Sequence, residues 1–326
     1  MPDSYEIRPL EAGPVWDDFV HRANGGTVFS TDAWLHCAQR CLGGQIRRYG
    51  CFKNGRLTAG VSGLARTRLG LRSLSTPPLT PHGGLLLAPV ASKGPAKTEA
   101  EWNRATDELV AYLQGHYHHT HLVLSPAIAD IRPFTWKGWS HRARYTYQFQ
   151  LGDEDSLWER LERRTRTVIR KAEKSDFRVR QTDDLDLFRR QYESIYSRQG
   201  GAPAAAATVQ HFVGEVLAAG LGRALVVESA AGQAAAIVVF VHGFDTVYAW
   251  QAGADPAQNN SGALSLLYWR LLVQAPRAHF DFVGANLPSI AHFKRGFGGD
   301  LVPYHAIDGF SGGWPRRLYS LWRGHS

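Results

Sequence analysis

Seven basic side chains gather on one arc of the helix that the sequence predicts from Asp153 to Lys174. Successive helical residues advance by about 100°, so the apolar residues of this segment share one face and the basic residues share the opposite face. The basic residues are Arg160, Arg163, Arg164, Arg166, Arg170, Lys171 and Lys174. Only Glu162 and Glu173 lie among them, and because neighbouring like charges repel, solubility alone does not require this pattern. The face suits the phosphates of RNA or of a nucleotide-linked substrate, and a solvated surface face is the alternative.

A second candidate site for anions follows a predicted strand, Thr246 to Gln251, and precedes a predicted helix, Gly262 to Ala275. Free backbone N–H groups and the positive end of the helix dipole meet at such a junction. Acetyltransferases of the GNAT type hold the coenzyme A pyrophosphate at a loop of this kind. Asn260, Ser261 and Gly262 are therefore candidate phosphate-binding residues, with Ser261 where the GNAT pattern has its first glycine.

The stretch after this helix carries the most specific pattern in the chain. It reads FDFVG at residues 280–284 and FKRGFG at residues 293–298. Upstream, RKAEK stands at residues 170–174, and Phe29 and Trp34 form an aromatic pair near the N-terminus. In this order the motifs resemble those of the Fem-like transferases, whose sequences close with an FDFxG strand and an FKxxFG turn. The resemblance touches most of the chain and is tightest over residues 236–304.

This resemblance implies two GNAT-like domains and an acyl-transfer activity. The best-known Fem-like proteins move an amino acid from aminoacyl-tRNA to an amine of a peptidoglycan precursor peptide. We therefore expect tRNA and a nucleotide- or lipid-linked precursor as partners, with aminoacyl-tRNA as co-substrate and no tightly bound cofactor. The first alternative is an N-acyltransferase that depends on acyl-CoA and has an unknown acceptor. The second is a non-catalytic module that binds nucleic acid through the basic helix.

The expected reaction is attack of an amine on an activated acyl carbon, and the oxyanion that forms needs a cation or a hydrogen-bond donor. Lys294, predicted in a glycine-rich turn after a strand, is the candidate for that role, and an exposed loop charge is the alternative. Asp281 interrupts an apolar strand, so we expect it to bind the substrate amine or to pair with Lys294 or Arg295. Tyr248 is the third catalytic candidate, with aromatic packing as its alternative. The candidates for binding substrate or tRNA are Arg163, Arg166, Arg170, Lys171, Lys174, Trp250, Asn286, Arg295 and Tyr304.

Four histidines between His116 and His121 invite a metal-site hypothesis. They span a predicted helix end and strand start without an accompanying carboxylate in the sequence, which favours a polar exposed turn. The three cysteines, Cys37, Cys41 and Cys51, form neither a disulfide framework nor the two closely spaced pairs of ligands that a zinc site needs. No metal is therefore expected. The sequence also lacks the motifs of serine hydrolases, P-loop NTPases and zincins.

Both halves of the chain predict the same order of elements: helix, helix, hairpin, strand, helix, strand. The clearest hairpin signal is Asn54-Gly55 between two apolar runs. This repeated order predicts an α/β (α+β) fold of tandem GNAT-like domains, with mixed sheets flanked by helices. The expected domains are residues 1–150 and 151–310, followed by a tail, 311–326, that packs back on the body.

With 326 residues, of which 44% are hydrophobic, the chain can bury the cores of two domains. Its net charge of +8 favours an anionic partner, including peripheral contact with an anionic membrane. The first residues lack the pattern of a signal peptide, and no stretch is apolar enough for a transmembrane segment. We therefore expect a cytoplasmic protein.

Overall fold

The computed structural model describes residues 4–91, 94–196, 204–258 and 260–312, and the chain divides into two compact units. The first unit comprises residues 1–144 and the chain from Pro303 onward, and the second comprises Tyr145–Val302. The boundary predicted near residue 150 falls at the end of strand β7 (Ser140–Gln150), which has residues in both units. The predicted domains 1–150 and 151–310 stay predictions, and the predicted tail lies outside the described residues except for 311 and 312.

The sheet of the first unit follows the strand order β1-β2-β3-β4-β6-β13, with β5 paired to β3 beside this path. Its strands are β1 (Tyr5–Pro9), β2 (Gln45–Lys53), β3 (Arg56–Arg68), β4 (Leu71–Ser75), β5 (Leu85–Leu87), β6 (His119–Val123) and β13 (Asp300–Phe310). β4 and β6 run parallel, whereas the other pairs are antiparallel. The predicted turn joins β2 to β3, and Asn54 and Gly55 have φ values of 50° and 81°, as a type I′ turn requires.

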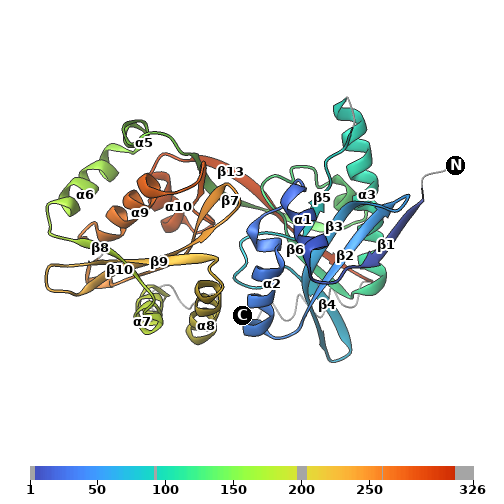
Figure 1. Cartoon of the computed structure of the whole chain (residues 1–326), viewed down its shortest axis with the longest axis horizontal. Coiled ribbons are helices and arrows are strands. Elements are labelled where there is room, and N and C mark those ends of the chain that lie inside the picture. The colour runs from blue at the N-terminus through green and yellow to red at the C-terminus, as the bar shows by residue number, and fades with distance from the viewer. Residues whose placement is uncertain (1–3, 92–93, 197–203, 259, 313–326) are drawn as a thin grey trace. The chain divides into compact units, whose positions relative to one another are not determined.

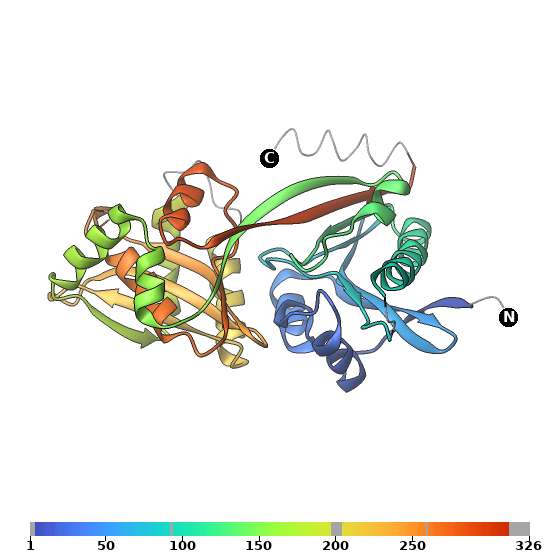
Figure 2. The ribbon, with the colours of Figure 1, turned by 90° about the horizontal axis from the view of Figure 1, so that it is seen from above.

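Helices cover both faces of this sheet. The long helix α3 (Pro95–His116) packs Leu109 and Leu113 against Tyr49 and Cys51 in one core. On the other face, α1 (Pro14–Arg22) brings two aromatic side chains close to Gly60, where a Cβ atom would lie 2.9 Å from Phe19. Helices α2 (Asp32–Leu42) and α4 (Arg132–Trp136) complete the unit. Figure 2 shows α3 and the α1–α2 pair on opposite sides of the strands.

The sheet of the second unit follows the order β7-β12-β11-β10-β9-β8. Its strands, besides β7, are β8 (Arg178–Thr182), β9 (Gly222–Glu228), β10 (Ala234–His242), β11 (Thr246–Ala254) and β12 (His279–Asp281). Only β11 and β12 run parallel among these pairs. A core of aromatic and aliphatic side chains from β7, β10, β11 and β12 lies against the helices that follow in sequence.

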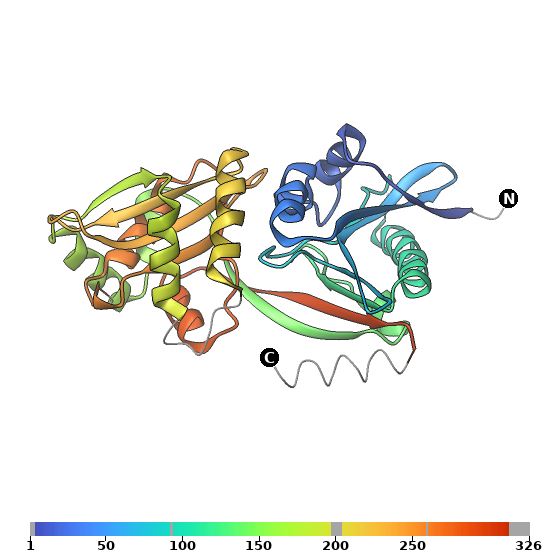
Figure 3. The same ribbon diagram turned by 90° about the horizontal axis from the view of Figure 1, so that it is seen from below.

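Two layers of helices enclose this second sheet. Helices α5 (Glu154–Arg160), α6 (Arg163–Glu173), α9 (Ala263–Gln274) and α10 (Pro288–Arg295) lie on one face (Figure 1). Helices α7 (Leu185–Tyr196) and α8 (Ala206–Ala218) cover the other, as the view from below shows (Figure 3). α9 is buried on nearly all sides because its residues are apolar around the whole helix and it packs between α6 and β10.

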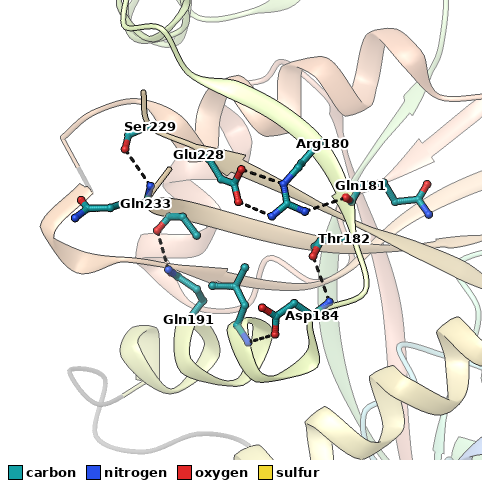
Figure 4. Close-up of polar contacts among 10 residues, drawn as sticks. Arg180, Gln181, Thr182, Asp184, Gln191, Glu228, Ser229 and Gln233 are labelled. Carbon is teal, nitrogen blue, oxygen red and sulfur yellow. Dashed lines mark hydrogen bonds and ion pairs between the residues drawn. The ribbon is translucent and has the colours of Figure 1, made fainter. Parts of the chain in front are cut away.

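Polar contacts fix α7 to the edge of the second sheet (Figure 4). Arg180 on β8 forms hydrogen bonds of 2.9 and 2.5 Å with the Glu228 carboxylate on β9. Asp184 Oδ1 accepts from the Leu187 backbone N–H at 2.8 Å and so caps the first turn of α7. Further along the helix, Gln191 Nε2 donates to the Ala234 carbonyl at 2.9 Å. The bond from Gln191 ties the middle of α7 to β10, and the last turn of this helix lines the cavity described below.

The fold class agrees with the sequence prediction, since mixed sheets flanked by helices occur in both units. The single helix predicted from Asp153 to Lys174 was wrong, because the structure breaks it between α5 and α6. Leu161 and Glu162 have extended ψ angles of 138° and 146° at the break. The Glu162 backbone N–H donates to the Gly296 carbonyl at 2.9 Å, and the Leu161 side chain is buried. A tertiary hydrogen bond therefore replaces the helical one at this point.

Candidate active site

The parallel strands β11 and β12 pair only over Thr246–Tyr248 and His279–Asp281. β11 then continues to Ala254, whereas β12 ends. A β-bulge lies at Trp250, just beyond the last residue of β11 that pairs with β12, since the register of β11 with β10 passes from Ala249 to Gln251. Such a bulge bends the strand. The two strands therefore part, and backbone groups of β11 on that side have no strand partner in the described sheet.

A cavity of about 620 Å³ lies where these strands part. This volume is within the range of sites for small organic groups. Its walls come from the ends of α7, β11, α9 and α10 and from the loop after β12. The lining residues are Ser194, Ile195, Ala249, Trp250, Gln251, Ala252, Ala254, Pro256, Leu264, Tyr268, Val283, Gly284, Asn286, Leu287, Ser289, Ile290, Phe293 and Lys294. Apolar walls with a few polar groups are typical of a site that orients an acyl group and excludes water.

Lys294 lies in the last turn of α10, so its prediction in a turn directly after a strand was wrong. It is also buried, with 8% of its surface exposed, which contradicts the alternative of an exposed loop charge. Its Nζ donates to the carbonyl oxygens of Phe282, Val283 and Gly284 at 2.7, 3.0 and 2.6 Å. An ammonium group has three hydrogens and no lone pair, so three carbonyls match its charged form. Burial lowers the pKa of Lys294 to about 8, and the charge of Asp281 opposes that shift.

The loop that Lys294 holds has an unusual backbone. Val283 has a φ of 54° and Gly284 one of 80°. A β-branched residue seldom adopts a positive φ, so the surrounding contacts must maintain this conformation. The three carbonyls around the ammonium belong to this turn and the residue before it. Lys294 therefore places one positive charge at the cavity wall and fixes the shape of that wall.

Asp281 is buried and fully engaged with its own unit. Oδ1 accepts from the Thr146 hydroxyl at 2.5 Å and from the Val283 N–H at 2.7 Å, and Oδ2 accepts from Gln148 Nε2 at 2.8 Å. In the described part of the chain no ion pair within 4.0 Å joins it to Lys294 or to any arginine, so the predicted pairing was wrong. Asp281 does not line the cavity. Its place beneath the loop makes it a positioning residue.

The other predicted site residues divide into two groups. Trp250 and Asn286 line the cavity, and Asn286 Oδ1 also accepts from the Tyr145 N–H at 2.9 Å. Tyr248 is buried beside Asp281 without lining the cavity, and burial raises its pKa well above the usual range, helped by the Asp281 charge. Tyr304 belongs to the first unit, where it packs with Val123 and Ala306, so it is not part of this cavity.

Arg295 follows Lys294 in the sequence, but its side chain does not line the cavity. It is exposed, and its Nε donates to Glu162 at 3.1 Å. The second acid of the predicted basic helix, Glu173, pairs with Arg270 on α9 at 3.2 Å. Both acids thus turn toward neighbouring helices and away from the cations of α6.

The basic face of α6 is solvent-accessible and largely unneutralised. Among the described residues, no acidic side chain lies within ion-pair distance of five of its cations, Arg163, Arg164, Arg166, Lys171 and Lys174. The other two predicted members differ. Arg160 belongs to α5 and pairs with Asp300 at 3.0 Å, and Arg170 stacks over Trp158 with its Cζ 5.3 Å from the ring centre. The site residues predicted on this helix are therefore brought together on one surface.

The predicted phosphate loop is partly closed. Asn260 is exposed, Ser261 Oγ donates to the Gln258 carbonyl at 2.6 Å, and Asn259 lies outside the described residues. Gly262 begins α9 with a φ of 82°, and a Cβ there would lie 2.8 Å from the Val168 carbonyl oxygen and 3.2 Å from Ala172 Cβ. Helix α6 thus packs directly on the glycine. None of the three candidates lines the 620 Å³ cavity, although Gly262 lines a smaller neighbouring one.

The histidine cluster has a carboxylate that the sequence did not reveal. Asp308 on β13 accepts from His119 Nε2 at 3.1 Å and from His121 Nδ1 at 2.9 Å. The expectation that no carboxylate accompanies these histidines was therefore wrong. Even so, the described residues contain no group of three or more such side chains arranged to hold a metal ion.

Sequence reasoning missed several residues of the site. Ser194 and Ile195 on α7 and Tyr268 on α9 line the cavity, and Thr146 and Gln148 on β7 hold Asp281. A signal was available for β7 only, where polar residues 146 and 148 alternate with the buried aromatic residues 147 and 149. The sequence patterns of α7 and α9 are those of ordinary core helices, so they gave no signal for their cavity-lining residues.

Comparison with known proteins agrees with this geometry. Residues 159–295 match the family model described as an acetyltransferase (GNAT) domain. The crystal structure of FemX superimposes with a TM-score of 0.72 at 12% identity, covering 96% of this chain and 99% of that one. L-PGS from Bacillus licheniformis gives a TM-score of 0.56 at 11% identity, covering 96% of each chain. A tandem GNAT protein from the clavulanic acid biosynthesis pathway gives 0.50 at 11% identity, covering 95% of this chain and 99% of that one.

The match over residues 159–295 identifies an acetyltransferase (GNAT) domain there, which confirms the predicted acyltransferase class, and the superpositions confirm the predicted fold class. No curated protein matches the chain. Among the described residues no helix is both long enough and apolar enough to cross a membrane.

Proposed function

We propose that the protein transfers an aminoacyl group from aminoacyl-tRNA to an amine of a peptidoglycan precursor peptide. The observation that carries the proposal is the basic face of α6, in the same unit as the cavity, where five cations have no acidic partner among the residues that the structure describes. A tRNA presents a dense row of phosphates, and each neutralised phosphate adds a favourable electrostatic contribution. A small acyl donor does not need a basic surface of this extent for binding.

In the proposed reaction the acceptor amine attacks the carbonyl carbon of the aminoacyl ester. The new C–N bond forms, the ester C–O bond breaks, and the proton lost by the amine goes to the departing ribose hydroxyl. The oxyanion of the intermediate gains stability from the nearby charge of Lys294. All three hydrogens of that ammonium are bound to carbonyls, so Lys294 acts through its field and through the loop that it holds.

The close packing at Gly262 favours a tRNA ester over a coenzyme A thioester. A pyrophosphate bound at a helix N-terminus needs open backbone N–H groups. Here the Val168 carbonyl and the Ala172 methyl group occupy the space beside the glycine. An acyl-CoA-dependent N-acyltransferase remains the second candidate, because the matching family is described as an acetyltransferase (GNAT) domain.

The test follows label from a pool of charged tRNAs into a UDP-linked muramyl pentapeptide, with labelled acetyl-CoA in a parallel reaction. The variant Arg163→Ala/Lys171→Ala should raise the KM for tRNA several-fold and leave turnover at saturation unchanged. A matched control, Arg178→Ala/Arg223→Ala, removes two exposed arginines from β8 and β9 and should leave the KM unchanged. Transfer from acetyl-CoA but not from tRNA, or equal effects of both variants, would reject the proposal.

A further inference from the structure

A second basic surface lies in the first unit, at the end of the β3–β4 hairpin. β3 pairs with β2 as far as Ala65, and β4 pairs with β6 only from Ser73 onward. Residues 66–72 therefore form a two-stranded ribbon with no third strand beside it in the described sheet. Figure 1 shows this ribbon extending from the sheet at the lower edge of the first unit.

Arginines stand on both faces of the ribbon. Arg66 and Arg68 share one face because they are two residues apart, and Arg72 lies on the other because it pairs with Thr67. Arg47 on β2 lies on the same face as Arg72 by the register of β2 and β3. All four line a cavity of about 770 Å³, and none of the described residues in its walls is acidic. Among the described residues, no carboxylate lies within 4.0 Å of the guanidinium groups of Arg47, Arg66 and Arg72.

The tip of the ribbon is apolar and strained. Leu69 has 94% of its surface exposed, and its φ is 50°. The Asn54-Gly55 turn of the same sheet gives a direct comparison, because its φ values of 50° and 81° nearly equal those of Leu69 and Gly70, 50° and 78°. Asparagine suits the first position of such a turn, whereas leucine is strained there and exposes its side chain to water. The folded chain alone gives no reason for leucine at this position.

We propose that this ribbon docks the protein on an anionic phospholipid surface, with Leu69 inserted among the lipids and the arginines bound to lipid phosphates. In such a surface the hydrocarbon region lies beneath the layer of lipid phosphates. An apolar tip can therefore reach the hydrocarbon while the long cationic side chains beside it bind the phosphates. A soluble phosphate or an RNA would engage the arginines equally well but would leave Leu69 in water. The two observations on one short ribbon therefore favour the lipid surface.

The experiment measures sedimentation of the full chain with vesicles of phosphatidylglycerol and phosphatidylcholine, and with vesicles of phosphatidylcholine alone. Leu69→Asn suits the positive φ and keeps every charge, and it should lower the partition coefficient for the anionic vesicles about tenfold with no loss of Tm. Arg66→Ala/Arg68→Ala/Arg72→Ala should lower it on the order of a hundredfold, at roughly fivefold for each arginine. Val15→Asn, at a residue of the same unit with 72% exposure, is the matched control and should bind like the wild type.

Three results would overturn the proposal: no binding to anionic vesicles, equal binding to the neutral vesicles, or wild-type binding by Leu69→Asn. If only the arginine variant loses binding, and pyrophosphate or tRNA competes with the vesicles, the surface binds soluble phosphates or RNA instead. The inference does not rest on the proposed aminoacyl transfer. Transfer to a soluble UDP-linked acceptor should be the same in Leu69→Asn and wild type, so the two proposals fail separately.

Discussion

Replacing Lys294 by methionine tests the part of the site that depends most on one side chain. Methionine keeps nearly the same length but removes the ammonium that binds three carbonyls. The carbonyl of Phe282, a fully buried residue, loses its partner at a cost of about 1–3 kcal/mol. Val283 and Gly284 line the cavity, where water can replace the ammonium at less cost. Release of the strained turn at Val283 offsets about 1 kcal/mol of this loss.

The expected loss in the free energy of unfolding is therefore about 1–3 kcal/mol. Urea unfolding followed by circular dichroism measures it, with Lys171→Met on the exposed face of α6 as the control, expected to stay within about 0.5 kcal/mol of the wild type. A Lys294→Met protein as stable as the wild type would refute the conclusion that this ammonium holds the loop. For the folded fraction of the variant, kcat for aminoacyl transfer should fall by about 10²–10³. Unchanged turnover would reject the electrostatic role and leave only the positioning role.

Three further predictions concern packing and protonation. In urea unfolding, Gly262→Ala should destabilise the protein by about 1–3 kcal/mol more than the control Gly220→Ala. Both glycines have a positive φ, but of the two only Gly262 has atoms within 4 Å of an added Cβ. Equal losses would contradict the close packing of α6 on α9. Burial lowers the pKa of Lys294 from 10.5 to about 8, so the unfolded chain holds the proton more tightly. The stability of the wild type relative to Lys294→Met should therefore rise between pH 8 and 10.5, and a constant difference over that window would show that the carbonyls outweigh burial. Burial raises the pKa of Asp308, but hydrogen bonds from two histidines lower it by more, so the net pKa lies below the usual value. Asp308→Asn should therefore be destabilising at neutral pH, and the difference in Tm from the wild type should shrink below about pH 4. A difference in Tm that stays constant with pH would exclude a stabilising carboxylate.

Local signals in the sequence were sufficient where the structure depends on neighbouring residues. The Asn54-Gly55 turn formed as predicted because its backbone angles are a property of those two residues. The opposite faces of α6 followed from helical period alone. That Asp281 needs partners followed from its place in an apolar strand, although the partners that the structure gives it are Thr146, Gln148 and the Val283 N–H group.

The remaining features depend on contacts between distant parts of the chain. The break at Glu162 exists because a carbonyl more than a hundred residues later, at Gly296, accepts its N–H group. Asp308 joins the histidines through the pairing of β6 with β13, and no spacing rule reveals such a partner. Lys294 could be named from its motif, but its three carbonyl partners appear only when α10 folds back over the loop after β12.

The pairing of β6 with β13 also bears on how the chain is made. Residues 119–123 find their strand partner at residues 306–310, after the whole of the second unit has been synthesised. Until then, β6 presents an unpaired edge, and such edges invite association with other chains. The second unit is continuous in sequence and can complete its sheet first, whereas the first unit must wait for a contact of long sequence separation. Nascent chains that end before β13 are therefore the species most in need of a chaperone.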